Sequence, residues 1–212
     1  MKKRIFMARC GPYDDSSLGS DLYESFEKMA EGGDKLELKP EALAMFEVKF
    51  PSEFKGCELV VSALELRCVQ TAKMISKNKL VTLPGLGEIS FSMKEIISKK
   101  EFFKNGRPQV DLARKLFVKK LMAGEITESL QSIISRAESV LNFIENEKAE
   151  NMVLVSHSFF MKIMETYLKD PGIKDQPKLI RNYFTGSEKF YDYFGGFRFS
   201  MYNLGKERKI KI

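Results

Sequence analysis

Three short apolar runs, each followed by a polar turn and a helix-like segment, constrain this 212-residue chain more than any other feature. They are residues 4–8 (RIFMA), 58–62 (ELVVS) and 152–156 (MVLVS). Apolar side chains recur at helical spacing after the second run, over residues 65–77, and after the third, over residues 159–168. This alternation is typical of an α/β fold. We expect three layers, in which a mostly parallel sheet is flanked by helices.

The middle of the chain, residues 91–147, contains no convincing strand. It is predicted to form helices at residues 108–122 and 128–147, the second preceded by the candidate N-cap Thr127. We therefore expect residues 91–147 to be a helical insert or cap within the sheet domain. The tail, residues 197–212, returns to short alternating strands.

The composition is that of an ordinary globular protein, with 43% hydrophobic and 30% charged residues, and favours one domain spanning residues 1–212. The net charge of +6 favours anionic ligands. The lysines are scattered rather than grouped, so we expect no nucleic-acid partner. No apolar run is long enough for a signal peptide or a membrane-spanning helix, which predicts a cytoplasmic protein with no membrane partner.

The cysteines and the histidine argue against a structural metal. The chain has three cysteines, Cys10, Cys57 and Cys68, and a single histidine, His157. No two cysteines share the spacing of metal ligands, and one histidine cannot complete a typical zinc site, so we expect no metal. A sparse, odd number of cysteines favours a reducing compartment.

Polar residues follow the three apolar runs where ligands usually bind in open parallel sheets, beyond the carboxyl ends of the strands. Arg9 and Cys10 follow the first run, Ser62 ends the second, and His157 follows the third. We expect Cys10 and His157 to meet in one cleft at this edge, together with Arg67 and Glu88. The sequence has no Walker A loop and no Gly-x-Ser-x-Gly elbow, and no cysteine has an arginine six residues later.

Four short segments of the chain resemble the histidine phosphatase superfamily, also called phosphoglycerate-mutase-like. Three of them follow the three apolar runs, and the fourth lies between the second and the third run. Its members have Arg-His-Gly after the first strand and Ser-Ser-x-x-x-Arg-Ala-x-Gln-Thr-Ala after the second. A Leu-x-Glu acid segment and a final Ser-His-Gly complete the pattern. The resemblance covers about residues 4–160, and the matching positions are Arg9, Gly11, Ser62, Arg67, Gln70, Thr71, Ala72, Leu86, Glu88, Ser156 and His157.

The resemblance implies a role for each matching polar residue. Arg9, Arg67 and His157 are expected to bind the phosphoryl group, since arginine matches its oxygens with paired hydrogen bonds. Glu88 is expected to donate a proton to the leaving alcohol. The residue at position 10 is expected to be the nucleophile, which forms a phosphoenzyme that water then cleaves without a cofactor.

The sequence departs from the family pattern at the nucleophile, where Cys10 stands in place of histidine. Its sulfur would fall short of the missing ring nitrogen by roughly 2 Å, and misplacement by about 1 Å can cost a hundredfold in rate. The other departures are Ala63 for the second serine, Cys68 for the alanine after Arg67, Ser92 for a frequent glycine, and Ser158-Phe159 for a glycine pair.

These observations predict a phosphatase-like protein that binds a phosphomonoester, carried by a small molecule or a phosphoprotein, with weak or absent hydrolysis. The alternative is an active, cofactor-independent phosphomonoesterase that uses Cys10 or a water molecule held by Glu88. A third possibility is an engineered trap in which a natural histidine at position 10 was replaced.

Overall fold

The structure of the chain is a computed structural model that describes residues 2–14, 21–32, 35–183, 191–204 and 207–212. Within these residues the strands form one sheet in the order β3-β2-β4-β1-β5-β6. The first four strands in this order are parallel, and the last two are antiparallel to their neighbours. The strands are β1 (Lys2–Arg9), β2 (Leu59–Ser62), β3 (Lys79–Thr82), β4 (Asn151–Ser156), β5 (Gly196–Leu204) and β6 (Glu207–Lys211).

Strand β4 lies at the centre of the parallel region, with β1 on one side and β2 on the other. Arg9 is level with Ser156, and Ser62 is level with Val155, so the three strands end at the same edge. The three apolar runs are therefore neighbouring parallel strands, as a mostly parallel sheet requires. Their side chains are almost all buried, as expected for strands covered on both faces.

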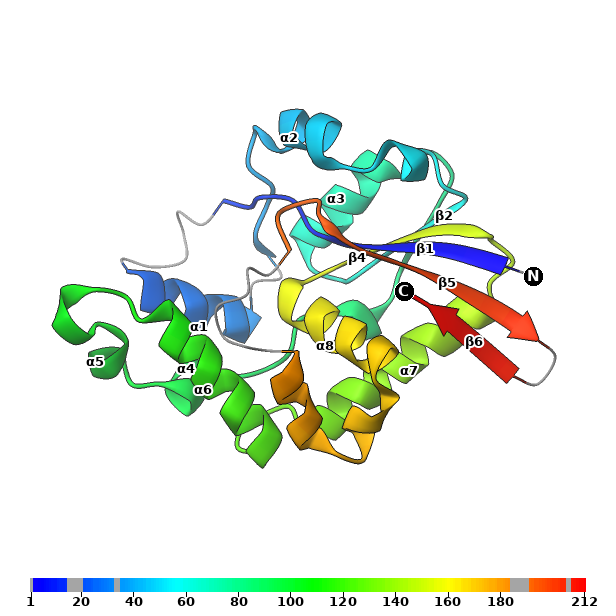
Figure 1. Cartoon of the computed structure of the whole chain (residues 1–212). Coiled ribbons are helices and arrows are strands. Elements are labelled where there is room, and N and C mark those ends of the chain that lie inside the picture. Colours follow the sequence, from blue (N-terminus) through cyan, green and yellow to red (C-terminus); the bar gives the residue numbers. More distant parts are fainter. Residues whose placement is uncertain (1, 15–20, 33–34, 184–190, 205–206) are drawn as a thin grey trace.

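Helices cover both faces of the sheet, which confirms the three-layer α/β fold (Figure 1). On one face lie α2 (Ala42–Lys49) and α3 (Leu66–Ile75), and on the other α7 (Leu130–Asn146) and α8 (Ser158–Lys169). Short 3-10 helices complete the connections: η2 (Ser52–Phe54), η3 (Pro84–Leu86), η4 (Lys104–Gly106), η5 (Pro171–Lys174) and η6 (Pro177–Asn182).

Four further helices gather beyond the carboxyl end of β1 (Figure 1). They are α1 (Leu22–Gly32), α4 (Met93–Ile96), α5 (Lys99–Phe102) and α6 (Val110–Ala123). Helices α4 to α7 account for the helical structure expected between residues 91 and 147, although α7 packs on the sheet domain, against α8. The assignment of this segment as an insert stays a prediction.

The predicted N-cap of α7 was wrong. Ser129, not Thr127, precedes the helix, and its hydroxyl accepts a hydrogen bond from Ser132 N at 3.2 Å. The Thr127 hydroxyl instead donates to Glu95 Oε1 at 2.7 Å and ties the start of α7 to α4. No helix in the described part of the chain has the length and hydropathy needed to cross a membrane.

Candidate active site

A cavity of about 180 Å³ lies at the carboxyl edge of the parallel strands. All five residues expected in the site line it: Arg9, Cys10, Arg67, Glu88 and His157. They come from the ends of β1 and β4, from the first turn of α3 and from the loop after η3. Much of the remaining wall is aromatic and comes from Tyr13, Phe26, Phe91, Phe117 and Phe159.

The position of Cys10 is fixed by its backbone. Its N–H donates to Ser156 O at 3.0 Å, which continues the pairing of β1 with β4 by one residue. The next residue, Gly11, donates its N–H to Thr71 Oγ1 at 2.9 Å. A Cβ atom at Gly11 would lie 2.5 Å from Cζ of Phe194, so only glycine fits against this ring. The Cys10 side chain lies at the floor of the cavity and is only 2% exposed.

Arg9 is positioned by the segment before β5. Its Nη1 donates to Tyr191 O at 2.7 Å, and its guanidinium carbon lies 4.1 Å from the ring centroid of Tyr193. The Arg9 backbone also pairs with this segment, because Phe194 N donates to Arg9 O at 3.1 Å. The arginine is therefore held at the cavity by aromatic stacking as well as by hydrogen bonds.

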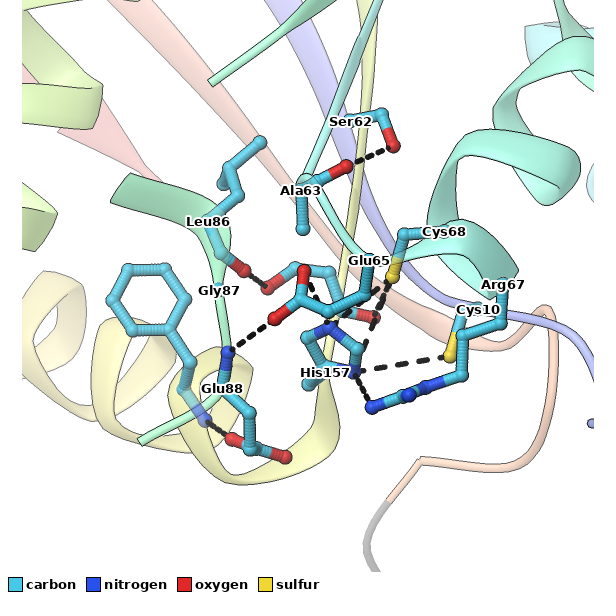
Figure 2. A network of polar contacts seen from close by, with 12 residues as sticks. Cys10, Ser62, Ala63, Glu65, Arg67, Cys68, Leu86, Gly87, Glu88 and His157 are labelled. Carbon is cyan, nitrogen blue, oxygen red and sulfur yellow. Dashed lines mark hydrogen bonds and ion pairs between the residues drawn. The ribbon is translucent and has the colours of Figure 1, made fainter. Parts of the chain in front are cut away.

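His157 lies at the centre of the polar network, between the end of β4 and the start of α8 (Figure 2). Its Nε2 is 3.2 Å from Glu65 Oε2. Burial acts to lower the pKa of His157, but hydrogen bonds with Cys10 and Glu65 raise it to about 9. Burial likewise acts to raise the pKa of Glu65, but its hydrogen bond with His157 lowers it to about 2. The two residues thus form an ion pair in which the imidazole is buried and the carboxylate is partly buried.

Arg67 approaches the other side of the same imidazole. Its Nη2 lies 3.2 Å from His157 Nδ1, and its guanidinium carbon lies 5.2 Å from the ring centroid of Tyr13. Arginine has donors only, so its contact with Nδ1 is a hydrogen bond only while that nitrogen keeps its lone pair. When His157 is protonated, Arg67 and His157 present two cations to one point of the cavity.

Two thiols flank this imidazole. Sγ of Cys10 is 4.0 Å from Nδ1 of His157, and Sγ of Cys68 is 3.3 Å from Nε2 and 4.0 Å from Nδ1. The Cys68 thiol and the charges of His157 and Arg67 hold the pKa of Cys10 well below its ordinary value, despite burial. Burial and the Cys10 charge raise the pKa of Cys68 well above its ordinary value. Cys10 is therefore the thiolate of the pair.

Glu88 lies at the N-terminus of α8, at the cavity wall. Its carboxylate accepts hydrogen bonds from Phe160 N at 2.9 Å, Ile89 N at 3.1 Å and Phe159 N at 3.4 Å. Arg136 supports the same loop by donating to Gly87 O at 2.9 Å. The side chain that the resemblance identifies as the acid is therefore firmly positioned beside His157's helix.

The sequence reasoning missed two members of this network, Glu65 and Cys68. The family pattern leaves position 65 open, so nothing in it pointed to a carboxylate. Cys68 was noted as a departure from alanine, but its sequence position alone did not place it against His157. Figure 2 shows both side chains pointing to the imidazole together with Cys10 and Arg67.

Comparisons with solved structures agree with this fold. Mycobacterial hydrolase 2 has 15% identity and a TM-score of 0.63, with 100% of this chain and 90% of that chain covered. The mycobacterial glucosyl-3-phosphoglycerate phosphatase has 14% identity and a TM-score of 0.56, with 99% of this chain and 97% of that chain covered. The Entamoeba histolytica phosphoserine phosphatase in complex with 3-phosphoglyceric acid has 16% identity and a TM-score of 0.54, with 99% of this chain and 95% of that chain covered. At these identities the similarity shows a shared fold.

Sequence comparison gives the family directly. No curated protein sequence matches this chain. The sequence model of the histidine phosphatase superfamily (branch 1) matches residues 39–185, which include Arg67, Glu88 and His157. With the fold and the order of the site residues in agreement, the chain belongs to the histidine phosphatase superfamily.

Proposed function

We propose that this protein binds a phosphomonoester in the cavity, with the phosphate held by Arg9, Arg67 and His157, and that hydrolysis is weak or absent. The observation that carries the proposal is the 3.2 Å contact between Arg67 Nη2 and His157 Nδ1 at the cavity wall. Two donors from different elements converge there, and Arg9 lines the same cavity.

The charges favour an oxyanion at this point. Because the pKa of His157 is raised to about 9, the imidazole is a cation at neutral pH and is repelled by Arg67. A phosphate group carries charge on several oxygens and accepts hydrogen bonds from both cations at once. Phosphate binding therefore adds to the offset of this repulsion that the Cys10 thiolate and the Glu65 carboxylate provide in the free protein.

Weak hydrolysis follows from the place of Cys10 in this network. Its sulfur is almost completely buried at the cavity floor and lies 4.0 Å from Nδ1 of His157. The nucleophilicity of a thiolate falls as its pKa falls, and the pKa of Cys10 is well below its ordinary value. The sulfur thus has both a short reach and a reduced intrinsic reactivity.

A phosphomonoesterase that uses Cys10 is the second candidate, and one observation favours it. A thiolate paired with an imidazolium is the arrangement of an activated cysteine nucleophile. In this reaction the sulfur attacks phosphorus and the ester P–O bond breaks. The alcohol then leaves with a proton from Glu88, and water cleaves the S–P bond.

The ligand is proposed to be small or to be a phosphorylated side chain, since the cavity is about 180 Å³. Phosphatases are prominent among the solved structures with this fold, and one of them is in complex with 3-phosphoglyceric acid. The aromatic wall gives the organic part of the ligand an apolar surface.

Hydrolysis of a generic aryl phosphate tests the two candidates. The assay compares wild type with Arg67→Ala and Cys10→Ala, and uses Cys57→Ala as the matched thiol control, since Cys57 lies at the other end of β2. The proposal expects wild-type turnover near the uncatalysed rate. Fast wild-type turnover that is lost in Cys10→Ala and kept in Cys57→Ala would establish the cysteine-dependent phosphatase instead.

A further inference from the structure

We infer that Cys10, Cys68 and His157 form a binding site for one thiophilic divalent metal ion of the Zn²⁺ class, with His157 binding through Nδ1. Three side chains from three separate segments, the ends of β1 and β4 and the first turn of α3, place their ligand atoms within 4.8 Å of one another. All three side chains are buried. This inference goes beyond the proposed phosphate site and does not depend on it.

The three ligand atoms must draw together to hold an ion. Sγ of Cys10 lies 4.0 Å from Nδ1 of His157, while Sγ of Cys68 lies 4.0 Å from Nδ1 and 3.3 Å from Nε2. With Zn–S of about 2.3 Å and Zn–N of about 2.0–2.1 Å, a tetrahedral site places sulfur and nitrogen roughly 3.6 Å apart. The Cys10 sulfur therefore has to move by a few tenths of an ångström, whereas the Cys68 thiol has to turn from Nε2 toward Nδ1.

Glu65 gives the imidazole the orientation that a metal ligand needs. Histidine ligands usually donate their second ring N–H to a carboxylate, which fixes the tautomer. Here Nε2 faces Glu65 Oε2 at 3.2 Å, so the lone pair of the neutral ring falls on Nδ1. Glu65 is itself oriented, because its Oε1 accepts a hydrogen bond from Glu88 N at 3.4 Å.

The two thiols are a paired departure from the family pattern. Members of the family have histidine where Cys10 stands and alanine where Cys68 stands, and neither residue type there supplies a thiolate. In this chain both positions carry sulfur, and both sulfurs lie beside the same imidazole. The phosphate-binding proposal does not explain Cys68, whereas a metal site uses it as a ligand.

The charges of the occupied site balance. Two thiolates and the Glu65 carboxylate carry three negative charges, and the ion with Arg67 carries three positive charges. Arg67 Nη2 now contacts Nδ1 at 3.2 Å, so it must move aside into the cavity when the ion binds. Three protein ligands leave a fourth position open on the cavity side for water or for an oxyanion.

Titration of the reduced, metal-free protein with Co²⁺ in phosphate-free buffer tests the inference. We expect one Co²⁺ per chain, a near-ultraviolet thiolate-to-cobalt charge-transfer band, and intense visible bands of a tetrahedral ion. One equivalent of Zn²⁺ should then remove these bands. Absence of the charge-transfer band in the folded wild type would overturn the inference.

Variants identify the ligands. Cys68→Ala introduces the residue common in the family and should abolish the charge-transfer band, as should Cys10→Ala, while Cys57→Ala should keep it. Glu65→Gln keeps all three ligands and should weaken Co²⁺ binding about 10–100-fold. A band that survives in Cys68→Ala, or one lost in Cys57→Ala, would contradict the assignment.

Phosphate binding by Cys68→Ala, measured separately, distinguishes this inference from the proposed function. If Cys68→Ala binds phosphate and lacks the cobalt band, both sites are supported. If wild type binds phosphate but gives no band, only the metal site is overturned. If wild type gives the band without binding phosphate, the metal site stands and the proposed function fails. Circular dichroism of each variant checks that it is folded.

Discussion

Sγ of Cys10 and Nδ1 of His157 lie 4.0 Å apart at the floor of the cavity. The negative charge of the thiolate is therefore next to the imidazolium and the Arg67 guanidinium, the groups proposed to bind phosphate. A nucleophilic imidazole at position 10 would reach past this point toward the ligand. The cations proposed to bind phosphate are present, while the side chain at the position of the nucleophile is shorter than the histidine of the family pattern.

Restoring the imidazole should therefore restore turnover, provided that it has room. Cys68 Sγ lies 3.3 Å from His157 Nε2, where the family pattern has the smaller alanine. We predict that Cys10→His with Cys68→Ala hydrolyses an aryl phosphate at least tenfold faster than wild type, because Arg9, Arg67 and His157 are proposed to stabilise the transferring phosphoryl. Steady-state kinetics measures the gain.

The single variants are the controls for this rescue. Cys68→Ala alone should remain as inactive as wild type, and Cys10→His alone should gain less than the double variant because of crowding. A double variant that folds and binds phosphate but stays inert would show that Ala63, Ser92 or Ser158 disables the site independently.

The three cysteines should differ in reactivity. Cys10 lines the cavity and has a lowered pKa, whereas burial raises the pKa of Cys57 to about 11 and that of Cys68 well above its ordinary value. With chelator present, iodoacetamide should modify Cys10 first, and phosphate should slow this reaction. Peptide mass mapping gives the order. Modification of Cys57 before Cys10, or equal rates with and without phosphate, would argue against this view of the site.

The Glu65–His157 pair predicts how stability varies with pH. The pKa of His157 rises from 6.5 to about 9 on folding, so its contribution is complete below pH 6.5 and is lost as pH rises through 9. The pKa of Glu65 falls from 4.5 to about 2, so its contribution is complete above pH 4.5 and is lost as pH falls toward 2.

Urea unfolding of wild type and Glu65→Gln at pH 3, 6 and 9.5, with chelator, measures this dependence. The stability advantage of wild type should be greatest at pH 6 and smaller at both extremes. Glu53→Gln removes a carboxylate from an exposed pair with Arg198 and should show no such maximum. An advantage that is the same at all three pH values would refute the ion pair.

Gly11 should not tolerate a side chain. A Cβ atom there would lie 2.5 Å and 2.9 Å from two ring atoms of Phe194, which is completely buried. We expect Gly11→Ala to lower the free energy of unfolding by about 1–3 kcal/mol, a typical cost of overpacking. Adding Phe194→Leu should recover part of this loss. A Gly11→Ala variant as stable as wild type in urea would contradict the packing.

The sheet was predictable where both of its faces are covered. β1, β2 and β4 appear in the sequence as continuous apolar runs because nearly every side chain is buried. β3 is half-exposed, so its residues carry no comparable run. The cap of α7 was missed because Thr127 and Ser129 are equally good candidates until their partners are known.

The site was predictable in part for a similar reason. The carboxyl ends of parallel strands must meet, so Arg9, Cys10 and His157 could be placed together from the sequence. Glu65 and Cys68 reach His157 through the turn between β2 and α3 and through the rotation of α3. Neither contact follows from apolar periodicity.

Anion binding by the folded protein tests the central claim most directly. Isothermal titration with orthophosphate compares wild type, Arg67→Ala and Arg198→Ala, the last an exposed arginine on β5 outside the cavity. We predict one phosphate per chain for wild type and for Arg198→Ala, and binding about 10–100-fold weaker for Arg67→Ala, the loss expected for hydrogen bonds to a charged group. No binding by wild type, or equal binding by Arg67→Ala, would contradict the account.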